Sequence, residues 1–305
     1  MTEISLPNGC QFLGWGGSGY VYKVNDKIAL KRSITAQDSR MKNEHLIFDL
    51  LEQQRSPCPN IIRSFFRLPD LNFMQFLPGG SLEVRLQSKQ ARDPDTQRVV
   101  NVTAREPYHL IIRWMTELSD AAAWLESLGF AHGDIRPSNL LLDSRDHLKL
   151  SDFDNTARVG EEVEVGTAPY ARILGPEAGT GCGTFGFLGP RTEQFAIGTV
   201  YYYLLRGYEP YDNVRFGKYH GRIVVDMLQR MEFPKLEDGS KDDTIIKQCW
   251  QHGFESICAL ARTIGSLTNG QDNRAEAIPQ DLFQKIQEEC RQIVLDGQLS
   301  SEGLV

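Results

Sequence analysis

The spacing of apolar residues changes at Pro78-Gly79-Gly80, and this change constrains the fold more than any other feature of the sequence. Before this point the apolar residues lie in short runs, and after it they recur at helical spacing. Short apolar runs bounded by turn residues are typical of β-strands, and the second pattern is typical of helices. We therefore predict an α+β protein with two parts, a small strand-rich part followed by a larger helical part.

The first part is expected to contain mainly strands and one helix. Asn25-Asp26 is predicted to form a turn between two strands. Ile47, Leu50 and Leu51 share a face at helical spacing and predict the helix. The expected strands cover residues 20–24, 27–31, 61–66 and 71–77, and the expected helix covers 41–51.

The second part is expected to be helical around two irregular segments. Apolar residues from Ile111 to Leu128 predict a long helix that ends at Gly129, and helical patterns return after Arg191 and continue to about residue 295. The polar stretch 87–106 predicts an exposed loop or insertion. Residues 156–190 are also irregular, and 175–190 hold six glycines in sixteen residues, so we expect a mobile loop there.

Composition excludes several classes of protein. The net charge is -7 with no long basic stripe, so we expect no nucleic-acid partner. The longest apolar run, Phe195 to Leu205, is shorter than the ~20 residues that a membrane span needs. The N-terminus lacks the pattern of a secretory signal, and six scattered cysteines show no zinc spacing. We therefore expect an intracellular protein, cytoplasmic or nuclear, with reduced thiols.

A glycine-rich segment near the N-terminus predicts a phosphate-binding flap. Gly14, Gly16, Gly19 and Val21 fit the pattern G-x-G-x-x-G-x-V. Glycines allow the backbone to lie close to phosphate groups, although a glycine-rich turn without function would look the same. Because a strand follows and not a helix, the segment disfavours a dinucleotide-binding motif. Lys31 ends IALK on the second strand after the flap, where a lysine can reach phosphate oxygens.

A lysine in this position requires a carboxylate that orients it. Glu44 lies one turn before Ile47 and Phe48, on or beside the inward face of the expected helix. Asp49 and Glu52 are the alternatives. We expect Glu44 to be the partner.

The stretch HGDIRPSN, residues 132–139, carries the remaining chemistry. In phosphoryl transfer the protein mainly positions groups and stabilises charge. Asp134 would accept the proton of an attacking hydroxyl, and Arg136 would lie where a cation can meet the transferred phosphate. Asn139 and Asp152 would bind Mg²⁺, which prefers oxygen ligands. A capping role for Asp134 and a turn role for Asp152 are the alternatives if each is taken singly.

The order of these motifs resembles the eukaryotic protein-kinase superfamily from about residue 10 to 295. The resemblance implies a bilobal protein kinase-like fold with a β-rich N-lobe at 1–77, a helical C-lobe at 78–295 and a disordered tail at 296–305. It also implies ATP and Mg²⁺ as cofactors and a protein substrate. Met74 would be the gatekeeper, and Gln75 to Leu77 would form the hinge that meets adenine. The stretch GPRTEQFAIGTVYYYLLRGYEPYD, with HGDIRP and DFDN, further resembles a divergent group of kinase-like proteins from filamentous fungi.

Several residues depart from the family pattern. Gly133 replaces the arginine that grips an activation-loop phosphate in many protein kinases, so we infer activity that does not need loop phosphorylation. Asp154 replaces the glycine of DFG, which restricts the backbone at that position. Glu193 stands for the aspartate that begins the buried helix F. Pro176-Glu177 and Pro190 both remain candidates for the family's APE motif.

Three functions remain in view. The first is an ATP-dependent protein kinase that acts on serine or threonine, since Arg136-Pro137 resembles the Lys-Pro of that class. The second is a small-molecule kinase of the aminoglycoside or choline type, which also uses the letters HGD. The third is a pseudokinase that acts as a nucleotide-binding scaffold. We favour the first because Lys31, Asp134, Asn139 and Asp152 are all present. The sequence predicts no oligomeric state.

Overall fold

The computed structural model describes residues 10–35, 38–268 and 275–295, and the tail expected at 296–305 lies outside them. The chain divides into two compact units. Among the described residues, the first unit combines 10–35, 38–78, 152–155 and 275–295, and the second combines 79–151 and 156–268. The two-part organisation that the change at Pro78-Gly79-Gly80 predicts is therefore present, but residues 152–155 and 275–295, expected in the second part, belong to the first unit.

The first unit is built on a five-stranded antiparallel sheet in the order β1-β2-β3-β5-β4. Its strands are β1 (Gln11–Trp15), β2 (Gly19–Lys23), β3 (Ile28–Ser33), β4 (Ser64–Leu68) and β5 (Leu71–Gln75). The predicted strand at 61–66 begins later, at Ser64. The register pairs Val21 directly with Lys31, so the flap strand and the lysine strand are neighbours.

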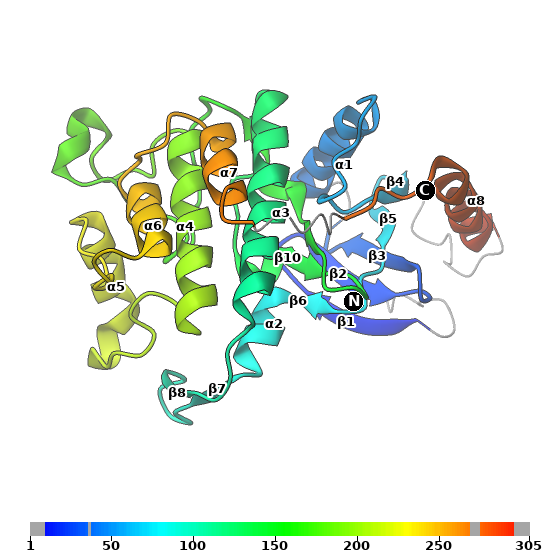
Figure 1. The fold of residues 1–305 in the computed structure, drawn as a ribbon. Coiled ribbons are helices and arrows are strands. Elements are labelled where there is room, and N and C mark those ends of the chain that lie inside the picture. The colour runs from blue at the N-terminus through cyan, green and yellow to red at the C-terminus, as the bar shows by residue number, and fades with distance from the viewer. Residues whose placement is uncertain (1–9, 36–37, 269–274, 296–305) are drawn as a thin grey trace. The chain divides into compact units, whose positions relative to one another are not determined.

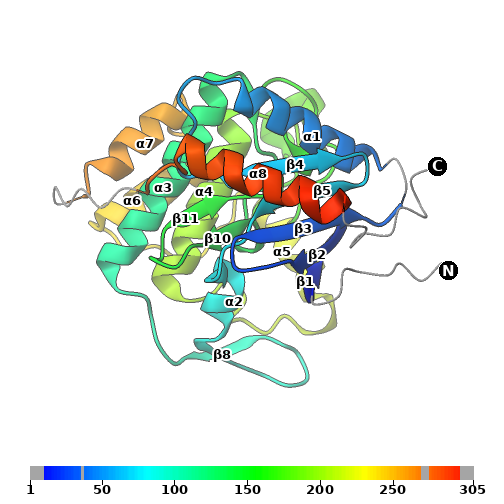
Figure 2. The same cartoon turned by 90° about the vertical axis from the view of Figure 1, so that its right-hand side faces the viewer.

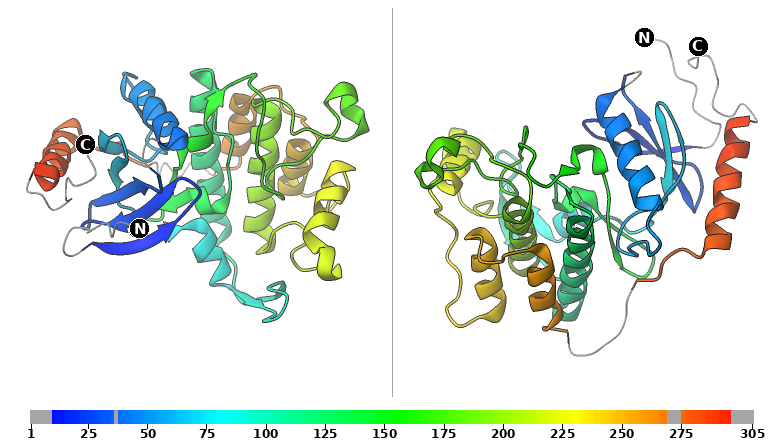
Figure 3. Two further views of the ribbon diagram at one scale, coloured as in Figure 1. Left: turned by 180° about the vertical axis from the view of Figure 1, so that it is seen from behind. Right: turned by 90° about the horizontal axis from the view of Figure 1, so that it is seen from above.

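Helices cover both faces of this sheet (Figure 3). Side chains alternate along a strand, so Ile28 and Leu30 of β3 point away from the face that carries Lys31. On the Lys31 side lies α1 (Ser39–Glu52), which buries Ile47 and Phe48 as its apolar spacing predicts. Asp38 caps this helix by accepting a hydrogen bond from the Arg40 amide.

The opposite face of the sheet is covered by the last helix, α8 (Gln280–Leu295), as Figure 2 shows. Phe283, Ile286 and Cys290 of α8 form one apolar cluster with Ile28, Leu30, Phe65, Leu71 and Phe73. The Gln287 side chain donates a hydrogen bond to the Phe65 carbonyl over 3.0 Å. The family resemblance implies one lobe over residues 78–295, but the contacts of α8 place this helix in the first unit. The apolar face of α8 could pack against any apolar surface, and the position of this helix in the sequence does not show which surface it covers.

The second unit is mainly helical. Figure 1 shows α3, α4, α6 and α7 side by side. These helices are α3 (Tyr108–Ser127), α4 (Pro190–Arg206), α6 (Lys241–Trp250) and α7 (Ile257–Gly265), with α2 (Leu82–Gln87) and α5 (His220–Gln229) beside them. Helix α4 is buried along most of its length and contains the longest apolar run. Among the described residues, no helix is long and apolar enough to cross a membrane.

Short strands and 3₁₀ turns complete this unit. The expected loop at 87–106 contains a hairpin that pairs Arg92 with Val99. The segment 156–190 is irregular as predicted except for one short strand and one 3₁₀ turn, and backbone hydrogen bonds such as Gly183 to Leu174 tie its turns together. The elements are β6 (Gly80–Ser81), β7 (Gln90–Arg92), β8 (Val99–Val102), β9 (Phe130–Ala131), η1 (Pro137–Asn139), β10 (Leu140–Leu142), β11 (Leu148–Leu150), β12 (Ala157–Arg158), η3 (Pro176–Gly181) and η4 (Gly217–Tyr219).

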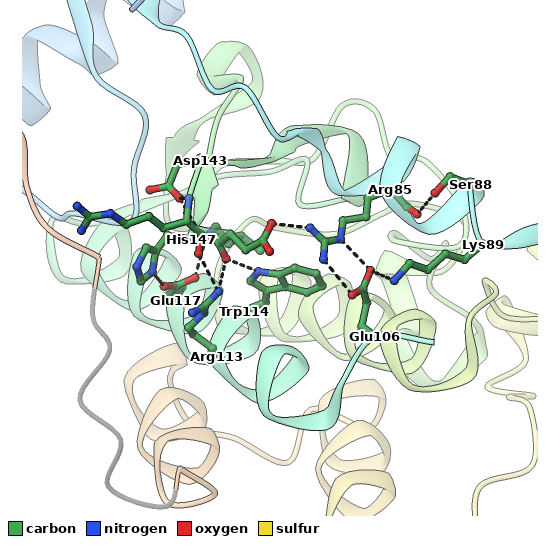
Figure 4. A network of polar contacts seen from close by, with 12 residues as sticks. Arg85, Ser88, Lys89, Glu106, Arg113, Trp114, Glu117, Asp143 and His147 are labelled. Carbon is green, nitrogen blue, oxygen red and sulfur yellow. Dashed lines mark hydrogen bonds and ion pairs between the residues drawn. The ribbon is translucent and has the colours of Figure 1, made fainter. Parts of the chain in front are cut away.

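A polar network fixes the turn between β10 and β11 to α2 and α3 (Figure 4). Arg85 of α2 pairs with Glu106 over 2.8 Å and with the Asp146 carboxylate over 2.5 Å. The Asp146 carbonyl also accepts a hydrogen bond from the Trp114 indole of α3 over 2.8 Å. Because the Glu106 side chain is only 1% exposed, it needs Arg85 and Lys89 as counter-ions.

The other end of this network is a buried acid on α3. Glu117 accepts hydrogen bonds from the His147 ring over 2.5 Å and from the Leu148 amide over 2.7 Å. The His147 amide donates to Asp143, which closes the turn. Strand β10 begins directly after Asn139, so the network holds the strand that follows the HGDIRPSN stretch.

Removal of a large apolar side chain from α8 should destabilise the first unit. We expect Phe283→Ala to cost about 3 to 5 kcal/mol, because it opens a cavity against the sheet. Amide hydrogen exchange in β3 and β5 should become faster. Gln284→Ala, at an exposed position on the same helix, is the control and should leave the exchange unchanged. Equal exchange rates in both variants would contradict a stabilising role for α8.

Acid should also destabilise the first unit through His45 of α1. Burial, followed by the nearby Arg67, lowers the pKa of His45 to about 4, and its Nε2 finds no hydrogen-bond partner in the part of the chain that the structure describes. The unfolded chain binds a proton at this histidine below about pH 6.5, whereas the folded chain does so only near pH 4, so the free energy of unfolding falls across this range.

We expect His45→Gln to reduce the change in thermal unfolding midpoint between about pH 7.5 and about pH 5. The exposed His109→Gln serves as the matched control. If both variants show the same pH dependence as the parent chain, His45 does not contribute to it.

Candidate functional site

The first unit holds a buried ion pair between β3 and α1. The Lys31 ammonium lies 3.0 Å from a Glu44 carboxylate oxygen, and the two side chains are 7% and 0% exposed. Asp49 and Glu52, the alternatives, both pair with Arg67 instead. The structure therefore selects Glu44 as the carboxylate next to Lys31.

Lys31 has a second carboxylate partner in the same unit. Its ammonium lies 2.6 Å from Asp152 Oδ1. Burial alone would lower the pKa of Lys31, but the carboxylates of Glu44, Asp152 and Asp154 outweigh this effect and raise it. Lys31 is therefore a permanent cation that can bind anionic oxygens.

Asp152 is held in an unusual backbone conformation. Its φ is 68°, in the left-handed region that residues with a Cβ rarely adopt. Phe153 follows and packs edge-on against Phe48 of α1, with ring centroids 5.3 Å apart. Such strain persists only where the surroundings impose it, and it is common at functional sites.

The residue after Phe153 is tied to α1 as well. The Asn43 side chain donates a hydrogen bond to the Asp154 carbonyl over 3.0 Å, and Asp154 Oδ1 accepts one from Asn155 over 2.6 Å. Asn43 was missed in the sequence because no spacing rule relates it to residue 154. The contacts add to the restriction that we expected from the Cβ of Asp154.

The flap is a turn between β1 and β2. The Gly16 amide donates to the Gly19 carbonyl over 2.9 Å. A Cβ on Gly19 would lie 2.4 Å from the Arg32 carbonyl, so only glycine fits there. Among the described residues, a Cβ on Gly14 or Gly16 would meet nothing within 4 Å, so no contact with that part of the chain requires these two glycines. Open space over a glycine backbone suits a ligand that approaches closely.

The predicted adenine-binding residues follow along β5 in the first unit. Met74 is buried and pairs with Ala29 of β3, and Gln75 ends the strand opposite Ile28. Leu77 is also buried. These positions lie on the strand next to the one that carries Lys31.

The second unit holds the HGDIRPSN stretch around Asp134. The Asn139 side-chain amide donates hydrogen bonds to the Asp134 carboxylate over 2.9 Å and to its carbonyl over 2.8 Å. Arg136 forms an ion pair with the same carboxylate over 3.0 Å. Because the NH₂ group of Asn139 is used at Asp134, its amide oxygen is the atom suited to Mg²⁺.

A buried glutamate in the first turn of α4 holds the HGDIRPSN stretch through hydrogen bonds to its backbone. Glu193 accepts hydrogen bonds from the backbone amides of His132, over 2.8 Å, and Gly133, over 3.2 Å. Burial raises the pKa of Glu193, and these bonds act in the opposite sense. The His132 ring bonds the Ser151 carbonyl over 3.0 Å. Glu193 can therefore take the place of the aspartate that the family pattern has near the start of this helix.

The glycine at position 133 has a local reason. Its φ is 80°, a conformation that glycine adopts without strain.

The two candidates for the APE motif have different contacts and positions. Glu177 pairs with Arg172 over 2.8 Å, and Pro190 begins α4. Which of the two corresponds to the APE motif of the family stays a prediction.

Comparison with known proteins gives the chain its relatives. The family described as "Protein kinase domain" matches residues 8–285. Aurora kinase B of Xenopus tropicalis is 31% identical over 252 residues, which are 75% of this chain and 61% of that protein. Rho-associated protein kinase 1 of Homo sapiens is 27% identical over 199 residues, 60% of this chain and 13% of that protein.

The cAMP-dependent protein kinase catalytic subunit PRKX of Mus musculus is 24% identical over 268 residues, 83% of this chain and 61% of that protein. The chain thus spans at most about three fifths of the length of these relatives. The five-stranded antiparallel sheet of the first unit and the larger helical second unit are the N-lobe and C-lobe of that fold. With its family pattern matched over most of its length, the chain belongs to the protein kinase family.

Proposed function

We propose that this chain is an ATP-dependent protein kinase that transfers the γ-phosphate to a serine or threonine hydroxyl. The observation that carries the proposal is the buried pair of Lys31 and Glu44. A lysine side chain loses much hydration when it is 7% exposed, and a carboxylate assigned to it offsets that cost. The pair keeps a cation in place for the phosphates of ATP.

The other residues supply the remaining parts of phosphoryl transfer. Asp134 would orient the substrate hydroxyl and accept its proton, and Arg136 would stabilise charge on the transferred group. Asp152 and Asn139 offer oxygen atoms of the kind that Mg²⁺ binds, and the metal would neutralise phosphate charge. The preference for serine or threonine rests on Arg136-Pro137, which resembles the Lys-Pro of such kinases.

Finer expectations belong to the same proposal. The resemblance to a divergent filamentous-fungal group stays a prediction. All six cysteines lie in the described residues as free thiols, which supports a location in the cytoplasm or nucleus. The expected partner is a protein substrate.

Replacement of the proton acceptor tests the proposal directly. With labelled ATP, Mg²⁺ and a generic basic protein, we expect Asp134→Asn to lower phosphate transfer by about 10² to 10⁴-fold. ATP binding should remain, because the Lys31–Glu44 pair is unchanged. Lys31→Met should instead weaken ATP binding itself.

Asp281→Asn, at an exposed position of α8, is the matched control and should transfer phosphate like the parent chain. Transfer that is absent from the parent chain, despite Mg²⁺-dependent ATP binding, would favour a nucleotide-binding scaffold. Transfer that survives in Asp134→Asn would indicate a contaminating kinase.

Activity should not depend on phosphate in the activation segment. Gly133 has no side chain that could pair with a loop phosphate, so treatment with a broad-specificity protein phosphatase should change kcat by less than about twofold. Mass spectrometry of the treated chain checks that phosphate is gone. A large loss of kcat would show that another cation of the chain binds a loop phosphate.

A further inference from the structure

A small cavity lies in the second unit beside the predicted proton acceptor. It has a volume of about 30 Å³, which is space for about two water molecules. Gly133 and Asp134 line one side of it, and the segment 163–188 and the start of α4 line the rest. Most of the wall is apolar, with Val163, Phe185 and Phe195 among its residues.

Two arginines reach this cavity from different segments. Arg172 comes from the irregular segment, and Arg191 comes from the first turn of α4. The Arg172 side chain is only 2% exposed, and its Nε has no hydrogen-bond partner among residues 10–35, 38–268 and 275–295. Its carboxylate partner Glu177 is 45% exposed, so that pair is weakened by solvent.

Arg191 contacts oxygen atoms that carry no full charge. Its guanidinium donates hydrogen bonds to the backbone carbonyls of Phe185 and Phe187. Burial, followed by the charge of Arg172, lowers the pKa of Arg191. The two guanidinium groups thus repel each other, and a shared anion would relieve this repulsion.

The pKa of a nearby histidine reflects the positive charge of the same two arginines. Burial, followed by Arg191 and Arg172, lowers the pKa of His252 to about 4. Both ring nitrogens of His252 are buried and lack a hydrogen-bond partner within the described segments. The buried Arg172 Nε, a donor for which the described residues supply no acceptor, calls for an anion or water.

The carboxylates already at the cavity are engaged elsewhere. Asp134 bonds Asn139 and Arg136, and Glu193 accepts the amides of His132 and Gly133. An incoming anion would therefore face Arg172 and Arg191 in apolar surroundings, where an ion pair is stronger than in water. The volume of the cavity suits a carboxylate better than a phosphate group.

We propose that this cavity selects protein substrates with an acidic side chain close in sequence to the accepting hydroxyl, and that Arg172 and Arg191 bind its carboxylate. The inference rests on the proposed function, because it uses Asp134 as the point where the hydroxyl is held. A residue beside the acceptor lies within a few ångströms of it, since an extended chain advances about 3.3 Å per residue. Its side chain can therefore enter a cavity that Asp134 lines.

Degenerate serine peptides test the selection. Each library fixes one position near the serine as Asp, Ala or Lys, and kcat/KM is measured for the whole chain. At one or two positions we expect Asp to exceed Ala by about tenfold, because hydrogen bonds to charged groups are strong, and Lys to fall below Ala. Equal use of Asp and Ala at every position would overturn the proposal.

Variants assign the preference to the two arginines. Arg191→Gln should reduce the Asp-over-Ala ratio to about one while activity on the Ala library stays measurable. Arg172→Gln should do the same, and Arg172→Lys should restore part of the ratio. The exposed Arg222→Gln in α5 is the matched control for charge alone and should keep the full ratio. A preference that survives in Arg191→Gln would overturn the assignment even if Arg172→Gln fails to fold.

A direct binding measurement separates this inference from the proposed function. Sodium acetate is titrated into the whole chain, and the side-chain Nε–Hε signals of Arg172 and Arg191 are followed by NMR, with sodium chloride as the control salt. Both signals should shift when acetate is added and should keep their positions when chloride is added. Static signals would overturn the anion site, whereas moving signals in a chain that phosphorylates no peptide would overturn the proposed function and the substrate selection with it.

Discussion

The buried ion pair between Lys31 and Glu44 is the interaction on which the first unit depends. Two charges that leave water are costly unless they meet in good geometry, so β3 and α1 must be held at a fixed distance. The sheet register sets one side of this contact, and the apolar face of α1 sets the other. Asp152 then joins the pair at 2.6 Å in a strained backbone conformation, which places a carboxylate beside a permanent cation.

A buried glutamate has the corresponding role in the second unit. Glu193 lies in the first turn of α4, which is buried along most of its length, and accepts two backbone amides of the stretch that carries Asp134. The position of Asp134 is therefore determined by α4, and the network around Glu117 and Arg85 fixes the strands that follow. The same helix presents Arg191 to the cavity beside Gly133. One helix would therefore both hold the stretch that carries Asp134 and take part in substrate selection.

Local patterns in the sequence predicted much of this arrangement. Helical spacing placed Glu44 on the inward face, ahead of Asp49 and Glu52, because three residues before Ile47 is nearly one turn. Turn residues and apolar runs located the strands around Lys31, with the strand near residue 61 starting three residues late. The hairpin at 90–102 was expected only as a loop, since its strands are short and lie in a stretch dominated by polar residues.

Contacts between distant segments could not be predicted in this way. The apolar face of α8 was visible, but many surfaces could have covered it, and only the packed structure shows Phe283 against Phe65. Arg172 and Arg191 stand nineteen residues apart in an irregular segment and a helix, and no periodic rule relates them.

The sequence by itself determined the identity and order of the groups that carry the chemistry, because those groups follow local motifs of glycine, lysine, aspartate and asparagine. The tertiary structure alone decided which charges are buried, that Asp152 joins the pair of Lys31 and Glu44, and which face α8 covers. The physical reason is that burial and pairing depend on the summed packing of segments far apart in the chain, whereas a motif depends only on its neighbours.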